Sequence, residues 1–189
     1  MWPKSERQNV KKLRQGRREA CEALICQHYK SIYCFMAYLT ADVNLAEELT
    51  QETFASAWEN IDCFKGRASF KTWLHQIAYR KFIDSRRRLQ RNDALMAKLK
   101  KEKFDASEVL NPLHRLIADE HSHLLYEAIR RLKSSEYVVI VLHYIQGLSF
   151  RQMAKVLDEP VGTVKWQTSR TLKKLKAHLI LQRHKGSRI

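Results

Sequence analysis

Apolar residues recur every three or four positions along most of the chain, which is the spacing of amphipathic helices rather than of strands. Between residues 20 and 40 the stripe consists of Ile25, Tyr29, Ile32, Met36 and Leu39. The pattern predicts either one helix here or two helices joined near His28. With only 5 glycines and 3 prolines among 189 residues, few positions interrupt helical structure, so the sequence predicts an all-α protein.

A second helix is predicted over residues 45–61, with Asn44 as its cap. Its buried face would consist of Leu49, Thr53, Ala57 and Ile61, widened by Phe54 and Trp58. The opposite face repeats at the same spacing and carries Glu48, Glu52, Ala55 and Glu59. A helix with one apolar face and one acidic face is expected at the surface of a bundle.

A loop centred on Gly66 follows, and Ser69 is placed to cap a helix that ends in the arginine triplet at 86–88. The buried side of this helix is predicted to consist of Trp73, Leu74, Ile77 and Ala78. The side chains expected mainly elsewhere are Lys71, His75, Tyr79 and Arg80. Residues 20–90 therefore make a first helical domain, preceded by a basic arm at 1–19.

Residues 91–119 are predicted to be a flexible linker, because they contain few apolar positions and Pro112 breaks helical continuity. A second helical domain is expected over 120–182, with a basic tail at 183–189. The β-branched stretch 137–145 could form a strand, but Ser134 or Ser135 can cap a helix there. Because Gly147 can end that helix, we predict a helix.

Two short helices follow almost without a break. Ser149 and Gln152 form an S-x-x-Q capping box, and Pro160 suits the first position of the second helix. The inward-facing residues are predicted to be Met153, Ala154 and Leu157, then Val164, Leu172 and Leu175. Two helices joined by so short a turn predict a helix-turn-helix, whose second helix lies in the major groove of DNA. Its exposed face would carry Gly162, Thr163, Lys165, Trp166, Ser169, Arg170 and Lys173.

Charge supports a nucleic-acid partner. The chain carries 35 Lys and Arg against 20 Asp and Glu, a formal net charge of +15, which suits the phosphates of DNA. The acids gather between residues 42 and 61, whereas 64–103 and 162–189 are strongly basic. This order favours one surface for a protein partner and two for nucleic acid, although each block alone could be a solvated helix face.

Other classes of site find little support. The four cysteines are Cys21, Cys26, Cys34 and Cys63, without C-x-x-C spacing, so we expect reduced thiols, no metal site and no cofactor. The N-terminus lacks the apolar core of a secretory signal, and the apolar stretch 137–145 falls short of the ~20 residues that span a membrane. We therefore expect a cytoplasmic protein without membrane insertion.

At these motifs the sequence resembles the extracytoplasmic-function (ECF) group of the sigma-70 family, the bacterial RNA polymerase sigma factors. The stretch AEELTQETFASAWENIDCFKGRASFKTWLHQIAYRKFID resembles sigma domain two, and GLSFRQMAKVLDEPVGTVKW resembles the helix-turn-helix of sigma domain four. Two matches in the right order with a linker between them are more specific than either alone. The resemblance implies a promoter-specificity subunit that carries out no catalysis.

The resemblance also implies roles for individual residues. In domain two, the β′ clamp helices of core RNA polymerase would bind at Glu47, Glu48, Gln51 and Glu52. The minus-ten promoter element would be read and melted by Phe64, Lys65, Arg67, Ser69, Lys71, Thr72, Trp73, Gln76 and Arg80. Domain four would read the minus-thirty-five element through the exposed face of its second helix and contact the polymerase β flap. Many family members also bind an anti-sigma factor, a further candidate partner.

Some positions depart from the pattern of the family. Arg80 stands where many members have Asn, Lys133 where many have Pro, and Lys165, Trp166, Gln167 and Thr168 where many have KSRL. We therefore expect different base preferences at both promoter elements, and weaker packing at Thr168.

Two other hypotheses compete with a sigma factor. A stand-alone helix-turn-helix regulator explains residues 147–179 but neither the acidic helix nor the basic block that follows it. A nuclease needs clustered carboxylates for metal, whereas the acids here lie along one helix face away from the basic track.

Overall fold

A computed structural model describes residues 4–96, 128, 129 and 131–186 of the chain. Every element in these ranges is a helix, as the sequence predicts. The helices belong to two compact units, which divide between Asn111 and Pro112. Most of the predicted linker, 97–119, lies outside the described residues.

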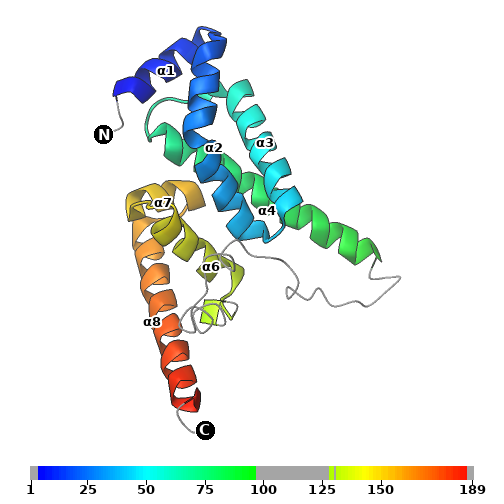
Figure 1. Ribbon diagram of the computed structural model, residues 1–189, viewed down its shortest axis with the longest axis vertical. Coiled ribbons are helices and arrows are strands. Elements are labelled where there is room, and N and C mark those ends of the chain that lie inside the picture. Colours follow the sequence, from blue (N-terminus) through cyan, green and yellow to red (C-terminus); the bar gives the residue numbers. More distant parts are fainter. Residues whose placement is uncertain (1–3, 97–127, 130, 187–189) are drawn as a thin grey trace. The chain divides into compact units, whose positions relative to one another are not determined.

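The first unit contains α1 (Lys4–Arg14), α2 (Arg18–Thr40), α3 (Val43–Glu59), the short 3-10 helix η1 (Ile61–Cys63) and α4 (Phe70–Met96). Helix α2 packs against α1, α3 and α4, and α3 also packs against α4 (Figure 1). The core between them contains fully buried side chains, among them Ile32, Phe35, Met36, Leu49 and Leu74. Burial of each such side chain stabilises the fold by about 1.5–3 kcal/mol.

The expectation of a basic arm at 1–19 is wrong for residues 4–14, which form a helix packed on α2. Glu6, Val10 and Leu13 lie at steps of four and three and are all buried. These steps put the three side chains on one face of α1. Most of its basic residues lie on the other faces, which is why the charge of the segment concealed an apolar stripe.

Helix α2 is continuous, so of the two alternatives left open by the sequence, the single helix is the one observed. His28 is buried, and its ring Nε2 lies 2.9 Å from Glu6 Oε1. The first half of the predicted stripe is displaced by one residue: Leu24 and His28 are buried, whereas Ile25 is half-buried and Tyr29 exposed. Because histidine is not counted as apolar, His28 was left out of the predicted stripe. At 3.6 residues per turn, leaving out one buried position shifts the predicted face of the helix.

The cap of α3 is Asp42 rather than Asn44. The Asp42 carboxylate accepts hydrogen bonds from the backbone N–H groups of Asn44 at 2.8 Å and Leu45 at 3.1 Å. Ser69 caps α4 as predicted, with its hydroxyl accepting from the Thr72 N–H at 3.1 Å. Helix α4 then continues through the arginine triplet to Met96, so residues 91–96 are helical rather than part of a linker.

The second unit contains α6 (Ser134–Ile140), the π-helical turn η3 (Val141–Ile145), α7 (Phe150–Leu157) and α8 (Val161–Gly186). The β-branched stretch is therefore helical, as predicted, and Gly147 ends it with a φ of 67° in the left-handed region. Neither serine caps α6. The helix begins at Ser134, and the Glu136 side chain accepts a hydrogen bond from the Lys133 N–H at 2.9 Å.

The turn between α7 and α8 matches the predicted helix-turn-helix. Ser149 and Gln152 form the capping box, with the Gln152 side chain accepting from the Ser149 N–H at 2.8 Å. Asp158 takes a left-handed φ of 57°, and α8 begins one residue later than predicted, with Pro160 preceding its first residue. Helix α8 extends into the expected tail, since residues 183–186 are helical.

The inward faces of α7 and α8 are partly as predicted. Met153, Ala154, Val164 and Leu175 are buried. Leu157 is only half-buried, and Leu172 is exposed, contrary to expectation. Val156, Thr168 and Thr171 are buried in addition.

Candidate functional site

The acidic face of α3 is the first candidate interface. The side chains of Glu47, Glu48 and Gln51 are exposed, at positions three and four residues apart on α3. Neither Glu47 nor Glu48 lies within an ion pair that the structure records, so both carboxylates face solvent. Such a face is suited to a basic partner surface.

Glu52 differs from its neighbours on this face. Its side chain is only 30% exposed, and its Oε2 lies 3.3 Å from Lys81 Nζ on α4. Glu52, although it was predicted on the same face as Glu48, is therefore not freely exposed. The ion pair ties α3 to α4, and both partners are partly shielded from water, where a charge pair interacts more strongly than at an open surface.

A second candidate interface begins at the loop between η1 and α4. Phe64 and Phe70, at its two ends, are both 3% exposed. The two rings lie edge to face with centroids 5.7 Å apart, and the half-buried ring of Trp73 lies 5.0 Å from Phe64 and 5.6 Å from Phe70. The two phenylalanines are core residues, so Trp73 is the ring of this cluster that reaches the surface.

Basic and polar side chains surround that cluster. Lys65 and Arg67 are exposed in the loop, and Arg80 is exposed on α4. Lys71 and Gln76 are half-buried, and burial lowers the pKa of the Lys71 ammonium. This surface can therefore hold a nucleic-acid strand through its phosphates and present an aromatic ring to a base.

Two predicted positions in this region are interior. Thr72 is 1% exposed and pairs with Ser69, hydroxyl to hydroxyl, at 2.8 Å. His75, which was expected off the buried face, is fully buried. Its Nδ1 donates to the Lys71 carbonyl at 2.8 Å, and its ring lies 5.2 Å from Phe35. Ser69 and Thr72 thus shape the start of α4 from within.

The third candidate interface is the outer face of α8. The structure exposes every side chain predicted on it, together with Gly162: Thr163, Lys165, Trp166, Ser169, Arg170 and Lys173. Trp166 is 59% exposed, and the Arg170 guanidinium lies 5.1 Å from its ring centroid. This cation–π contact orders two long side chains beside each other before any ligand arrives.

A recess of about 220 Å³ opens next to Trp166 and Arg170. The α6 side of the recess is lined by Lys133, Ser135 and Glu136. Sequence reasoning gave Lys133 only as a departure from the family. Its position beside the exposed face of α8 adds a cation there.

Lys174 lies in a basic stretch of α8, where a lysine is expected to bind phosphate, but its ammonium is already paired. Its Nζ donates to both Glu136 oxygens, at 2.8 and 3.0 Å. The hydrogen bond from Lys174, followed by the backbone bond from Lys133, lowers the pKa of the Glu136 carboxyl. Lys174 therefore joins α6 to α8, whereas Lys173 and Lys176 are exposed.

The described residues offer little for other chemistry. Within them, no group of three or more His, Cys, Asp or Glu side chains is placed to hold a metal ion. Across the same ranges, no helix is both long and apolar enough to cross a membrane. Cys26 and Cys63 are exposed thiols, and Cys21 and Cys34 are half-buried.

Comparison with known proteins agrees with this layout. Residues 24–92 match the family described as Sigma-70 region 2, and residues 122–175 match Sigma-70, region 4. The first range includes the acidic face of α3 and the loop before α4, and the second includes the helix-turn-helix.

Relatives match along almost the whole chain. The ECF RNA polymerase sigma factor SigX of Bacillus subtilis is 30% identical over 167 residues, which cover 87% of this chain and 86% of SigX. SigW of the same organism is 29% identical over 184 residues, covering 92% of this chain and 96% of SigW. The ECF sigma-E factor of Escherichia coli K12 is 24% identical over 163 residues, with coverages of 82% and 84%.

Solved structures show the same fold. CnrH, solved in complex with the cytosolic domain of CnrY, gives a TM-score of 0.68 at 21% identity and covers 94% of this chain and 98% of its own. The sigma factor RpoE of Bartonella quintana, solved with the anti-sigma factor NepR, gives 0.65 at 21% identity, with coverages of 84% and 95%. With both sigma-70 regions present in order and relatives matched nearly end to end, this chain belongs to the ECF group of the sigma-70 family, the sigma factors that bind core RNA polymerase and direct promoter recognition in transcription initiation.

Proposed function

We propose that the three surfaces divide the work of a sigma factor: the acidic face of α3 docks on core polymerase, the loop and start of α4 open the minus-ten element, and the outer face of α8 reads the minus-thirty-five element. The observation that carries this proposal is the separation of charge. Exposed carboxylates gather on α3, whereas exposed cations gather beside Trp73 on α4 and beside Trp166 on α8.

Docking would use Glu47, Glu48 and Gln51 directly, against the β′ clamp helices of the polymerase. Glu52 would take part with its charge already shared with Lys81, 3.3 Å away. Reversing the charge of Glu47 or Glu48, which are freely exposed, should therefore weaken docking without changing the stability of the fold.

Opening of the minus-ten element requires a place for an extruded base and a track for the strand. Trp73 would supply the stacking surface, supported from below by Phe64 and Phe70 at 5.0 and 5.6 Å. Lys65, Arg67, Lys71 and Arg80 would hold the phosphates, and Gln76 would meet a base edge. Ser69 and Thr72 would act by holding the loop in shape, because their hydroxyls bond to each other.

Reading of the minus-thirty-five element would place the N-terminal half of α8 in the major groove. Lys165, Trp166, Ser169 and Arg170 would face the bases, with Gly162 and Thr163 at the close approach to the backbone. Lys173 would hold a phosphate. The Trp166 ring would fix the Arg170 guanidinium for a bidentate contact with guanine, the commonest specific contact of arginine in this groove.

Further partners follow from the family. The β flap of the polymerase would bind the helix-turn-helix unit, and the complexes of RpoE with NepR and of CnrH with CnrY favour an anti-sigma factor for this chain as well. The protein would act in the cytoplasm, where the polymerase works, as a binding subunit without catalysis or cofactor.

Transcription in vitro with purified core polymerase tests this function. Core polymerase with the full chain should produce defined transcripts from genomic DNA, and a footprint should protect two elements, minus-thirty-five and minus-ten. A stand-alone regulator would instead protect a single site without core polymerase and start no transcripts. That result would overturn the proposal.

A further inference from the structure

We infer that helix α1 is a positioning element for the minus-ten loop: it holds residues 64–70 in shape from behind, through Arg14 and through the buried pair of Glu6 and His28. None of these three residues needs to contact DNA for this role. The inference rests on the proposed function of that loop, and it concerns residues that the proposed interfaces do not include.

Arg14 reaches the first residue of the loop. Its Nη2 donates a hydrogen bond to the backbone carbonyl of Phe64, fifty positions away in the sequence. Phe64 directly follows η1, and its ring lies against both Phe70 and Trp73. A bond to this carbonyl therefore fixes the point where the chain enters the loop, together with the ring that supports Trp73.

The second contact reaches the other end of the loop. Glu6 is 2% exposed and His28 6% exposed, and 2.9 Å separates Glu6 Oε1 from His28 Nε2. A carboxylate is rarely buried unless it is paired, so the pair needs both partners in place. The His28 ring lies 5.6 Å from Phe70, the first residue of α4. The pair thus links α1, through His28 of α2, to Phe70 at the far end of the loop.

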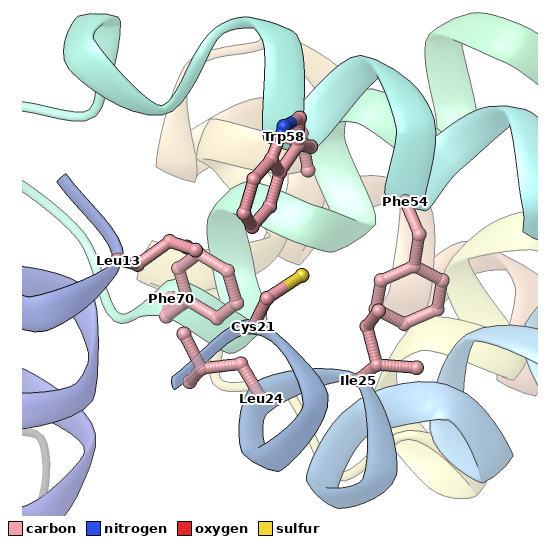
Figure 2. Close-up of a pocket in the computed structure, with 8 residues that line it drawn as sticks. Leu13, Cys21, Leu24, Ile25, Phe54, Trp58 and Phe70 are labelled. Carbon is pink, nitrogen blue, oxygen red and sulfur yellow. The ribbon is translucent and has the colours of Figure 1, made fainter. Parts of the chain in front are cut away.

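Packing joins the same parts. Leu13 of α1 and Phe70 of α4 line one small apolar cavity, together with Cys21 and Leu24 of α2 and Trp58 of α3 (Figure 2). Figure 2 shows the side chains of Leu13 and Phe70 next to each other at one end of this cavity. The cavity has a volume of about 20 Å³, and Phe70 is 3% exposed, so its neighbours enclose the ring. Helix α1 therefore reaches the loop directly through Arg14 and Leu13, and indirectly through the pair of Glu6 and His28.

A loop that captures a flipped base works best when its geometry is set before the base arrives, because ordering it during capture costs free energy. Loss of the α1 contacts should therefore slow opening of the duplex. It should have little effect where the strands are already separated, since a pre-melted base needs no extrusion. Docking on core polymerase should not change, because it is proposed to use the acidic face of α3 rather than the basic loop.

The test uses the full chain with core polymerase and a promoter found by footprinting the holoenzyme. Arg14→Ala is compared with Lys11→Ala, which removes the same charge from an exposed site on α1. We expect Arg14→Ala to slow open-complex formation on duplex DNA about tenfold, in line with a lost hydrogen bond from a charged group. Lys11→Ala should stay within about twofold of the wild type. On the same promoter with a pre-melted minus-ten segment, both variants should open at the wild-type rate.

Glu6 gives a second, independent variant. Glu6→Gln keeps an oxygen acceptor for His28, so it should retain most of the duplex opening rate, whereas Glu6→Ala should lose it and be restored by pre-melting. Thermal unfolding shows whether Glu6→Ala remains folded, and if it does not, Arg14→Ala decides alone.

The outcomes separate this inference from the proposed function. Equal opening by Arg14→Ala and Lys11→Ala on duplex DNA would overturn the role of α1 and leave the interfaces standing. An equal loss on duplex and pre-melted DNA would also overturn it, because Arg14 would then contact the strand or the polymerase itself. A wild-type protein that opens neither template would instead refute the proposed function.

Discussion

Single residues of the same type have different roles in this protein, and their partners decide which. Lys173, Lys174 and Lys176 occupy one basic stretch of α8, yet Lys174 alone donates to Glu136, at 2.8 and 3.0 Å, and the other two are exposed. The contacts with Glu136 give Lys174 a structural role that its basic neighbours do not share. A pattern of charge along a helix cannot distinguish these lysines, because the partner lies 38 positions away.

Glu136→Gln tests this link through its pH dependence. The folded-state pKa of Glu136 is lowered, so its stabilising contribution is present above the unfolded pKa and is lost as pH falls through the folded pKa. We expect the free energy of unfolding of the variant to be lower by roughly 1 kcal/mol at pH 7, because the ion pair with Lys174 and the hydrogen bond at the start of α6 are weakened. Urea unfolding from pH 7 down to pH 3 measures the difference, which should shrink as the pH falls. A difference independent of pH would contradict the assignment.

Thr168→Val tests the departure from an apolar residue at that position. Thr168 is 2% exposed, and its hydroxyl donates to the Val164 carbonyl at 2.8 Å. Since this bond already satisfies the buried hydroxyl, valine of the same shape should change the free energy of unfolding by less than about 1 kcal/mol. Thr168→Ala should cost more, because it leaves a cavity. Calorimetric melting of both variants gives the comparison, and a large gain from valine would show that the hydroxyl is poorly satisfied.

Arg170→Ala tests the reading face. On the preferred duplex the loss should be about 1–3 kcal/mol of binding free energy, with a relaxed choice of base at one position. Lys173→Ala removes an exposed cation from the same helix and is the control. It should weaken binding to all DNA sequences alike and lower the salt dependence of binding. Equal losses for Arg170→Ala on specific and random duplexes would show that it only touches phosphate.

At the scale of the elements, α3 combines a docking face with a structural link. Glu48 is exposed, whereas Glu52 is paired with Lys81 of α4. The two acids look equivalent in the sequence because both lie on the same periodic face. The packing of α4 distinguishes them.

Glu48→Lys should therefore abolish binding to core polymerase and leave thermal stability unchanged, because an exposed side chain on a helix surface contributes little to folding. Glu52→Lys should weaken both polymerase binding and thermal stability, since it also places a second cation beside Lys81. Glu59→Lys, exposed on the same helix but outside the residues proposed for docking, serves as the control that retains binding. Co-purification with core polymerase at moderate salt gives the readout, and a Glu48→Lys protein that still binds would argue against this face.

On the scale of the whole molecule, the chain consists of two units with cores of their own, 1–111 and 112–189. Each fragment should melt cooperatively and show helical circular dichroism. Neither should open a promoter with core polymerase, because the first lacks the minus-thirty-five reader and the second lacks the loop that melts DNA. An unfolded fragment would show that stability depends on contacts between the two halves.

Local signals in the sequence were sufficient for much of the fold. The capping box of Ser149 and Gln152, the Ser69 cap and the Gly147 stop are each encoded within four residues, so they could be predicted and are confirmed. Every side chain predicted on the exposed face of α8 is exposed for the same reason, since one helical period determines which side chains face solvent together, although Leu172, which was predicted to face inward, is exposed as well. The cap of α3 was predicted at Asn44, whereas Asp42, two positions earlier, is the residue that caps the helix.

The sequence by itself determined the helical class, the helix-turn-helix and the order of acidic and basic surfaces, because periodicity, caps and charge are properties of neighbouring residues. Thr53 was predicted on a buried face and is buried, but only the tertiary structure decided which other polar residues are interior. Glu6, His28, Thr72 and His75 are buried because partners on other turns and helices satisfy them. It also decided that residues 4–14 belong to the first unit and that Lys81 and Lys174 are held by carboxylates. Such pairs join segments far apart in the chain, and a periodic pattern contains no information about which distant helix will supply the partner.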